Sequence, residues 1–429
     1  MYLEPYLEAI EKINTFLNSE DIMSIECFTK KETDELLENI LTKIDDYLNE
    51  NVLLMKEPNF HSDLKSAVFE IIEIELELIL DETIRENLFE LIDYAETFYF
   101  DYVNEKRSYS DSIIRYEHNI KNIKDKIEDL RSRPQPDQRT DEWYVYRHNL
   151  LTASNAWKAF ESESFKNSLI YEKCCPINKE KFGHINMDTP FHWGHKYEPV
   201  SVEIYEDLYK TKVEDFGCIK DNNHEFLGVS PDGINVNESS KRYGRMLEIK
   251  NIVSREINGI PKKEYWIQMQ MQMNVCELPE CDFLETKFVE YDNYSSFLED
   301  GSFNKTMDEK QKGIMMCFIK DNIPIYEYCP LNKNKAEFEV WENEMIKKHE
   351  NDEWFKTIYW KLEIISCVLV TRNILWFNAA VPILKRCWEI IEYERENGYE
   401  HRAPKKRQVK SMVDEKPKIC LINLNTMTK

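Results

Sequence analysis

Apolar positions at the start of the chain recur with the spacing of a helix. They fall on one face of a 3.6-residue repeat and are Leu3, Leu7, Ile10, Ile13 and Leu17. Helix starts are predicted near Thr33 and Asp81, and a charged helix over 116–130. Residues 71–80 alternate apolar residues with glutamates as a strand would, but Leu and Glu favour a helix. The pattern therefore predicts a mostly helical region.

The apolar pattern changes after residue 130. Residues 131–138 are polar with two prolines and predict a linker. Short apolar runs between turn residues then predict strands at 213–219, 224–229, 233–236, 246–252 and 283–291. A helix is expected over 265–275. Residues 335–398, rich in Trp and charge, are expected to be helical and broken at Pro382.

These segments predict five regions. In order they are an acidic, mostly helical region 1–130, a linker 131–138, an α/β core 139–330, a helical C-terminal extension 331–400 packed on the core, and a basic irregular tail 401–429. The tail suits an import signal, a DNA contact or a solvated end equally well.

Charge is unevenly distributed along the chain. Residues 1–130 hold 32 Asp and Glu against 13 Lys and Arg, which accounts for −19 of the total charge of −24. The remainder is close to neutral, so a local basic groove for nucleic acid is compatible with the composition. Because the acidic region would repel DNA, we expect it to contact protein or to act as an electrostatic guard.

Cysteine usage and the N-terminus bear on the compartment. The eleven cysteines are odd in number and scattered, without zinc-finger spacing, which favours a reducing compartment over a disulfide framework. No signal peptide and no apolar stretch long enough for a membrane is recognisable. We therefore expect an intracellular protein that is not secreted and has no membrane partner. Ten glycines and no Gly-rich loop argue against an ATP-driven enzyme.

Two short motifs carry the chemistry: Ser-Pro-Asp-Gly at 230–233 and Leu-Glu-Ile-Lys at 247–250. In a strand, residues two apart project from the same face, so Glu248 and Lys250 would point the same way. If a hairpin brings Asp232 alongside, the result is a compact acidic cage for a hard cation with a lysine at its rim. Such a cage suits hydrolysis of phosphodiesters.

Mg²⁺ prefers few protein carboxylates and keeps several waters. Asp232 and Glu248 would supply the carboxylates, and the Ile249 backbone carbonyl a further oxygen. Lys250 would steer the attacking water and stabilise charge on the phosphate. Taken alone, the motifs leave open an ordinary hairpin turn beside a solvated strand face.

Further sequence segments favour a nuclease site over an ordinary hairpin turn. They are Trp143-x-x-x-Arg147, Thr152-Ala153-Ser154, Gly194-His195-Lys196-Tyr197-Glu198 with Tyr205, and Tyr265-x-x-Gln268-x-Gln270-x-Gln272-Met273. With the two central motifs, and in this order, they resemble the YqaJ-like viral recombinase and lambda-exonuclease family of the PD-(D/E)xK nucleases over residues 138–295. The aromatic segment 359–377 resembles the extension of versions from large DNA viruses.

The resemblance implies an α/β (α+β) fold with a restriction-endonuclease-like mixed central sheet flanked by helices. It also implies roles for individual residues. The metal ligands would be Asp232, Glu248 and Glu198, together with the Ile249 backbone carbonyl. Lys250 and Gln268 would complete the catalytic group. The 5′-phosphate of a DNA end would be bound by Arg147, Ser154 and Ser230.

Several of these residues could also have roles outside a nuclease site. Glu198 could be an acid favoured by a helix N-terminus, and Gln268 part of a polar helix face. Arg147 could form a surface ion pair with Asp141 or Glu142. The pair His192 and His195 could bind zinc, although no Cys or His partners stand at suitable spacing.

The resemblance implies a Mg²⁺-dependent DNA exonuclease, with one or two ions and Mn²⁺ as a substitute. It implies that the enzyme degrades linear duplex DNA from its ends in the 5′-to-3′ direction, in viral recombination, repair or replication. The expected location is the host cytoplasm, a viral factory or the nucleus, and packaging in the virion is a further option. Partners would be double-stranded DNA ends, a single-strand annealing protein and further copies of the chain. The alternatives are a structure-specific endonuclease on the same fold and a catalytically idle DNA-binding or virion-associated protein.

Overall fold

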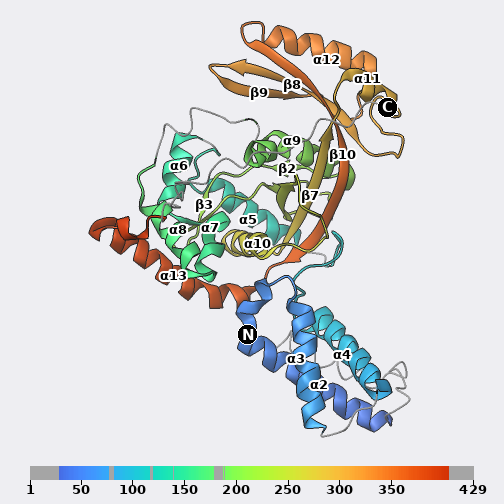
Figure 1. Ribbon diagram of the computed structural model, residues 1–429, viewed down its shortest axis with the longest axis vertical. Helices are drawn as coiled ribbons and strands as arrows, with labels where there is room; N and C mark the ends of the chain where they lie inside the picture. Colours follow the sequence, from blue (N-terminus) through green and yellow to red (C-terminus); the bar gives the residue numbers. More distant parts are fainter. Residues whose placement is uncertain are drawn as a thin grey trace, which may run out of the picture.

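The computed structural model describes residues 29–76, 82–115, 119–138, 140–177, 187 and 189–404 (Figure 1). The helix predicted over Leu3 to Leu17, the helix start predicted at Asp81 and the tail from residue 405 lie outside the described residues. The described part of the chain forms a helical N-terminal lobe, a mixed α/β core and an upper lobe continuous with the core sheet.

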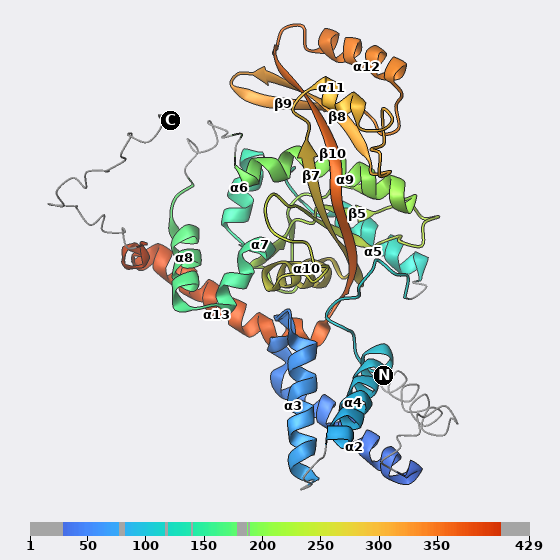
Figure 2. The ribbon, with the colours of Figure 1, turned by 45° about the vertical axis from the view of Figure 1, so that its right-hand side comes forward.

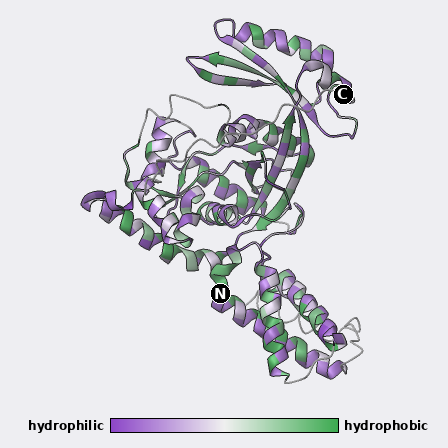
Figure 3. Cartoon of the chain, in the orientation of Figure 1, coloured by the Kyte–Doolittle hydropathy of each residue, from purple (hydrophilic) through white to green (hydrophobic). Residues whose placement is uncertain are grey.

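The N-terminal lobe consists of amphipathic helices. These are α2 (Lys30–Asn51), α3 (Phe60–Glu75) and α4 (Glu82–Tyr102), with the short turn η1 (Val52–Lys56) between the first two. Thr29 and Glu32 form a capping box that starts α2. Hydrophilic and hydrophobic stretches alternate along these helices in Figure 3, because their apolar faces pack on one another. The helical prediction is confirmed for these residues, including 71–75.

A strap over residues 103–115 connects this lobe to the core. The Tyr109 N–H donates to the Leu369 carbonyl at 2.9 Å, and the Leu369 N–H donates to the Asp111 carbonyl at 3.3 Å. The Ser112 hydroxyl donates to the buried Asp282 carboxylate at 2.7 Å. The strap therefore extends the hydrogen bonding of the core sheet by a few residues.

The helix that follows belongs to the core, which moves the domain boundary. In α5 (Ile120–Ser132), the Lys124 side chain pairs with Glu238 at 2.7 Å. Residues 131–138 also lie on the core, where Gln135 accepts from the Gly217 N–H at 2.8 Å. The predicted linker at 131–138 is therefore an ordered part of the core, and the break between lobes lies after α4 (Figure 2).

A seven-stranded mixed sheet forms the centre of the molecule, in the order β2-β5-β6-β7-β10-β8-β9. β6 and β7 are parallel, and the other neighbours are antiparallel. The strands are β2 (Val213–Glu214), β5 (Gly233–Asn235), β6 (Met246–Asn251), β7 (Glu280–Glu290), β8 (Lys312–Lys320), β9 (Ile323–Tyr328) and β10 (Glu353–Thr371). A small second sheet has the order β1-β4-β3, formed by β1 (Leu151–Thr152), β3 (Ile219–Lys220) and β4 (Leu227–Val229).

Helices cover both faces of the central sheet. On one face α9 (Pro190–Tyr209) packs over Leu247 and Ile249 of β6 through Tyr205. On the other face α10 (Lys263–Cys276) packs over Phe283 of β7. The remaining core helices are α6 (Asp141–His148), α7 (Ala153–Ala156), the turn η2 (Trp157–Phe160) and α8 (Glu163–Cys174). This mixed sheet flanked by helices confirms the predicted fold class.

The upper lobe is built on the far ends of long strands (Figure 1). Beyond the core, β8 pairs with the first half of β10 on one side and with β9 on the other. The helices α11 (Tyr294–Glu299) and α12 (Lys335–Lys348) pack on this part of the sheet through Phe297 and Phe338. The lobe therefore shares its sheet with the core.

The helical prediction for residues 331–400 is wrong over Glu353–Thr371, which form β10. The segment is dense in aromatic and β-branched residues, which favour a strand. It gains partners on both sides, from β7 and β8. The predicted break at Pro382 is also wrong, because Pro382 lies inside α13 (Ile374–Asn397). Trp376 before the proline and Trp388 after it are both buried, so tertiary packing holds the helix together.

Within the part of the chain that the structure describes, no helix combines the length and the apolar character that a membrane span requires.

Candidate functional site

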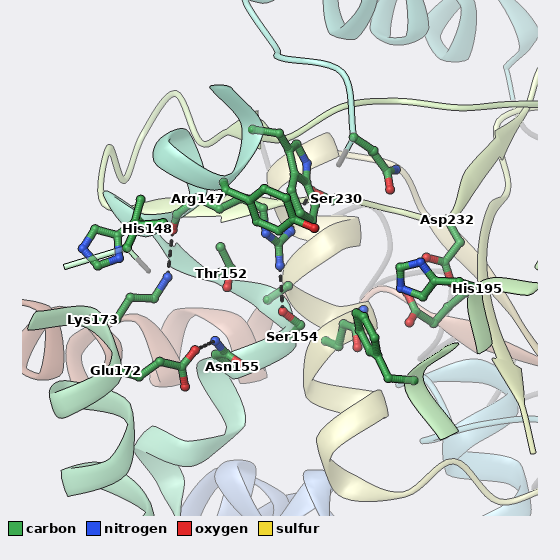
Figure 4. Close-up of a pocket in the computed structure, with 18 of the residues that line it drawn as sticks. Arg147, His148, Thr152, Ser154, Asn155, Glu172, Lys173, His195, Ser230 and Asp232 are labelled. Atoms are coloured by element: carbon green, nitrogen blue, oxygen red, sulfur yellow. Dashed lines mark hydrogen bonds between the residues drawn. The ribbon is translucent and has the colours of Figure 1, made fainter. Parts of the chain in front are cut away.

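A cavity of about 790 Å³ opens beside the carboxyl end of β4 and the middle of β6. It is lined by all eight residues whose side chains the sequence singled out. These residues are Arg147, Ser154, Glu198, Ser230, Asp232, Glu248, Lys250 and Gln268. They come from α6, α7, α9, α10, β6 and the turn after β4 (Figure 4). Residues up to 121 positions apart in sequence are thus brought to one site.

Asp232 is held beside β6 by its own carboxylate. β5 pairs with β6 from Gly233 onward, and one residue earlier the Asp232 Oδ2 accepts the Ile249 N–H at 2.7 Å. The carboxylate thereby replaces the next backbone acceptor of the ladder. Gly233 is required here, because a Cβ would lie 2.1 Å from Val213 Cγ1. The Pro-Asp-Gly turn therefore fixes the carboxylate against the strand.

Glu248 and Lys250 lie on the same face of β6, as their spacing predicts. Their side chains form an ion pair with each other, while Ile249 packs beneath α9 on the opposite face. Glu248 is fully buried, whereas Lys250 is partly exposed and lies 5.0 Å from the ring centroid of Tyr265. The ammonium therefore stands at the rim of a buried carboxylate.

The glutamines of α10 divide between two faces of the helix. The Gln272 amide donates to Glu248 Oε2 at 2.8 Å and to the Ser230 carbonyl at 3.3 Å. Gln268, one turn earlier, lines the cavity. Gln270 turns away and donates to the Thr371 carbonyl at 2.8 Å, where it fixes the corner after β10. Gln272 therefore orients Glu248, a contact that the sequence motif suggested only weakly.

The carboxylates and Lys250 are strongly coupled by charge. Burial and the charge of Glu248 raise the pKa of Asp232 well above its ordinary value, and Glu198 raises this pKa further. Burial lowers the pKa of Lys250, but Glu248 and Asp232 outweigh that effect and raise the pKa overall. Lys250 is therefore an ammonium at neutral pH, and the cluster keeps an excess of negative charge.

This donor set fits a hard divalent cation. All the donors are oxygens, and the mutual repulsion that raises the pKa of Asp232 is what a bound cation relieves. Among the described residues, no group of three His, Cys, Asp or Glu side chains has the spacing of a metal site. Two carboxylates completed by water and backbone oxygen would be sufficient for Mg²⁺, which is usually held in this way.

Arg147 forms the second part of the site. Its guanidinium donates to the Ser230 hydroxyl at 2.9 Å and to the Ser154 hydroxyl at 3.0 Å. It lies 4.3 Å from the ring centroid of Trp143, and burial lowers its pKa. The predicted alternative partners, Asp141 and Glu142, do not take part in these contacts. A half-buried cation bonded to two neutral hydroxyls has unused capacity for an anion.

The structure also shows where Glu198 and the histidines of α9 lie. Glu198 lines the cavity in the third turn of α9, because that helix begins at Pro190 rather than near Gly194. This position does not favour an acid through the helix dipole, which acts in the first turn. His192 and His195 diverge: the His192 ring bonds the Tyr326 hydroxyl at 2.7 Å, and His195 lines the cavity. The zinc alternative therefore has no support.

The cavity also contains residues to which the sequence assigned no role. Lys173 on α8 donates to the Arg147 carbonyl at 2.8 Å, and Gln138 donates to the Pro231 carbonyl at 3.3 Å. Thr152 stands two residues before Ser154 and lines the cavity as well. Thr152 belongs to a noted motif, whereas Lys173 is brought to the site only by tertiary packing.

Comparisons with known proteins bear on the family of the chain. Residues 142–279 match the family model of the YqaJ-like viral recombinase domain, which confirms the family predicted for this part of the chain. Uncharacterized protein R354 of Acanthamoeba polyphaga mimivirus is 29% identical over 352 residues, which are 72% of this chain and 62% of that protein. The chain thus spans less than two thirds of the length of this relative.

Two solved structures also resemble the chain. One is an alkaline exonuclease (LHK-Exo) from Laribacter hongkongensis, with 18% identity over 62% of this chain and 98% of that chain and a TM-score of 0.35. The other is LHK-Exo in complex with dAMP, with 17% identity, the same coverage of both chains and a TM-score of 0.35.

Proposed function

We propose that the protein is a divalent-metal-dependent exonuclease that removes nucleotides from the 5′ ends of linear duplex DNA during viral recombination. One observation carries the proposal. The Arg147 anchor, with its two hydroxyls, and the carboxylate–lysine cluster around Asp232 line the same cavity. An anion anchor beside a hydrolytic centre suits a substrate that presents a terminal phosphate one nucleotide from the scissile bond.

Each residue has a role in this proposal. Asp232 and Glu248, with Glu198, would hold one or two Mg²⁺ ions, or Mn²⁺ in their place, and the Ile249 carbonyl is a further candidate ligand. When bound, such an ion polarises the phosphodiester and makes a water molecule a stronger nucleophile. The Lys250 ammonium orients that water and stabilises charge on the phosphate oxygens, since it remains protonated.

The surrounding contacts keep these groups in place. Gln272 fixes the Glu248 carboxylate through its amide, and the Ile249 N–H fixes Asp232. Arg147, Ser154 and Ser230 would bind the 5′-phosphate through charge-assisted hydrogen bonds. Resection from the 5′ end leaves a 3′ single strand, which is the substrate of a single-strand annealing protein, and we include such a partner in the proposal.

The first test compares linear and closed circular DNA. With Mg²⁺, the protein is expected to release nucleotides from 5′-phosphorylated linear duplex and to leave covalently closed circles intact, because only the linear form offers an end to Arg147. Neither substrate should be degraded in EDTA. The measurement is release of labelled nucleotides over time. Equal degradation of circles and linear duplex would favour the endonuclease alternative, and no degradation of either would favour the idle alternative.

The second test concerns the anchor. Arg147→Lys keeps the charge but loses the forked geometry that reaches both serines. The preference in kcat/KM for 5′-phosphorylated over 5′-hydroxyl ends should fall by about 10- to 100-fold, since a hydrogen bond to a charged group contributes roughly 1.5–3 kcal/mol. Arg131→Lys, which makes the same change at an arginine of α5 outside the cavity, is the matched control. An unchanged preference in Arg147→Lys would place the terminal phosphate elsewhere.

A further inference from the structure

The cavity continues past the anchor, away from the carboxylates. Figure 4 shows Asp232 and His195 on one side of Arg147, and His148, Glu172 and Lys173 on the other side. All of these residues line the same cavity, whose volume of about 790 Å³ is in the range that encloses a whole small ligand. A terminal phosphate bound at Arg147 would therefore leave the far end of the cavity unfilled.

Thr152 provides a donor at this far end. The residue is 1% exposed and lines the cavity. Its Oγ1 is buried and, within the described ranges, has no hydrogen-bond partner. A buried polar group left unpaired loses its hydrogen bonds to water without replacing them, so such a group in a cavity wall indicates a ligand that completes it. Since Thr152 lies two residues from Ser154, its hydroxyl comes from the same turn as the anchor.

Lys173 provides the charge. Its side chain is 5% exposed and lines the cavity, and of its three N–H donors the described contacts use one, to the Arg147 carbonyl at 2.8 Å. Burial and the nearby Arg147 lower its pKa to about 7, a cost that a bound anion would remove. The neighbouring acid, Glu172, is already bonded to Asn155 and Lys158, each at 2.9 Å.

We propose that Thr152 and Lys173 form a second phosphate subsite, which takes a further phosphoryl group on the 5′ side of the phosphate bound at Arg147, linked to it either through a bridging oxygen or through one nucleoside. This inference rests on the proposed function. The ligand chemistry has two sources: a 5′-triphosphate end, or a 5′-phosphorylated end with one unpaired extra nucleotide. The protein would thus accept both kinds of DNA end. A site with room for only one phosphate would exclude them.

The reaction at either end is the same hydrolysis. The water oxygen bonds to the phosphorus that follows the first paired nucleotide, the bond from that phosphorus to the 3′-oxygen breaks, and the 3′-oxygen takes a proton. A triphosphate end therefore releases a nucleoside triphosphate, and an end with one extra nucleotide releases a dinucleotide. In both cases the new end carries a single 5′-phosphate, so only the first product reports on the subsite.

The experiment measures release of the first product from full-length protein with Mg²⁺. The substrates are duplexes with a 5′-monophosphate, a 5′-triphosphate, or a 5′-phosphorylated overhang of one nucleotide, labelled at the terminal nucleotide. The variants are Thr152→Val, which keeps the shape and removes the hydroxyl, and Lys173→Met. The matched control is Lys166→Met, which removes a half-exposed lysine of the same helix that pairs with Glu163 outside the cavity.

The wild-type protein should process the triphosphate or the overhang within about threefold of the monophosphate. In Thr152→Val and Lys173→Met, kcat/KM for that end, relative to the monophosphate, should fall by roughly tenfold, in line with one hydrogen bond to a charged group. The control should keep the wild-type ratio. The substrate whose ratio falls identifies the source of the phosphate.

Two results would overturn the subsite: a wild-type protein that rejects both extended ends, or unchanged ratios in both variants. Thr152→Ser restores the hydroxyl and should restore the ratio, which a general loss of folding would not do. If no end is processed, including the monophosphate, the proposed function fails instead, so the two failures are distinguishable.

Discussion

Lys250→Met is expected to reduce nucleotide release from linear duplex by about 10²–10³-fold, the effect of removing one preorganised group that stabilises charge in a transition state. Methionine keeps the length of the side chain but removes the ammonium. The pKa of Lys250 is raised by Glu248 and Asp232, so the lost group is a cation at the pH of the assay. The measurement is single-turnover release at saturating Mg²⁺.

The same substitution should also lower the thermal unfolding midpoint in metal-free buffer, since it leaves the buried Glu248 without its ion-pair partner. Lys287→Met, on the neighbouring strand and outside the cavity, controls for loss of a lysine from the sheet. If Lys250→Met keeps more than half of the wild-type rate, Lys250 is not a catalytic residue.

Asp232→Asn should cause a similar loss of activity, about 10²–10³-fold, but the opposite change in stability. Asparagine retains an oxygen that can accept the Ile249 N–H and removes a charge repelled by Glu248 and Glu198. The pKa of Asp232 is higher in the folded state than in the unfolded state. The free energy of unfolding of the wild-type protein therefore falls as the pH rises from the ordinary Asp pKa to the raised pKa of the folded state. At neutral pH without metal, the variant should therefore unfold at a higher temperature.

Divalent metal gives this prediction a second measurement. Wild-type protein should be stabilised by added Mg²⁺ according to its affinity, and the increase should be much smaller in Asp232→Asn. Asp207→Asn removes a carboxylate from α9 outside the cavity and should keep the full increase. A variant that is both less stable without metal and equally stabilised by Mg²⁺ would show that Asp232 is a structural acid.

The centre of the site could be predicted from the sequence because it depends on short-range geometry. The spacing of Glu248 and Lys250 in a strand places them on one face, and the Pro-Asp-Gly turn places Asp232 beside them. The anchor could be predicted only through the ordered set of motifs, since Arg147 and Ser230 are 83 positions apart.

Other parts depend on tertiary partners that a local pattern does not contain. β10 has aromatic and β-branched residues that favour a strand, but it also carries charged residues that suit a helix, and pairing with β7 and β8 selects the strand. Pro382 is accommodated because buried residues anchor α13 on both sides of it. Lys173 is brought to the cavity by its bond from α8 to the Arg147 carbonyl of α6, and no spacing in the sequence relates it to Arg147.

The strap between the lobes has a consequence for solubility. Where β8 ends, the described strands leave the outer edge of β10 unpaired, and the backbone at Tyr109 and Asp111 pairs with Leu369 there. An uncovered edge next to apolar residues is a template for strand addition by another chain. The acidic N-terminal region is therefore joined to the core by a segment that also protects this edge from self-association. A shortened chain that begins after α4 keeps that protection, whereas one that begins at α5 exposes the edge.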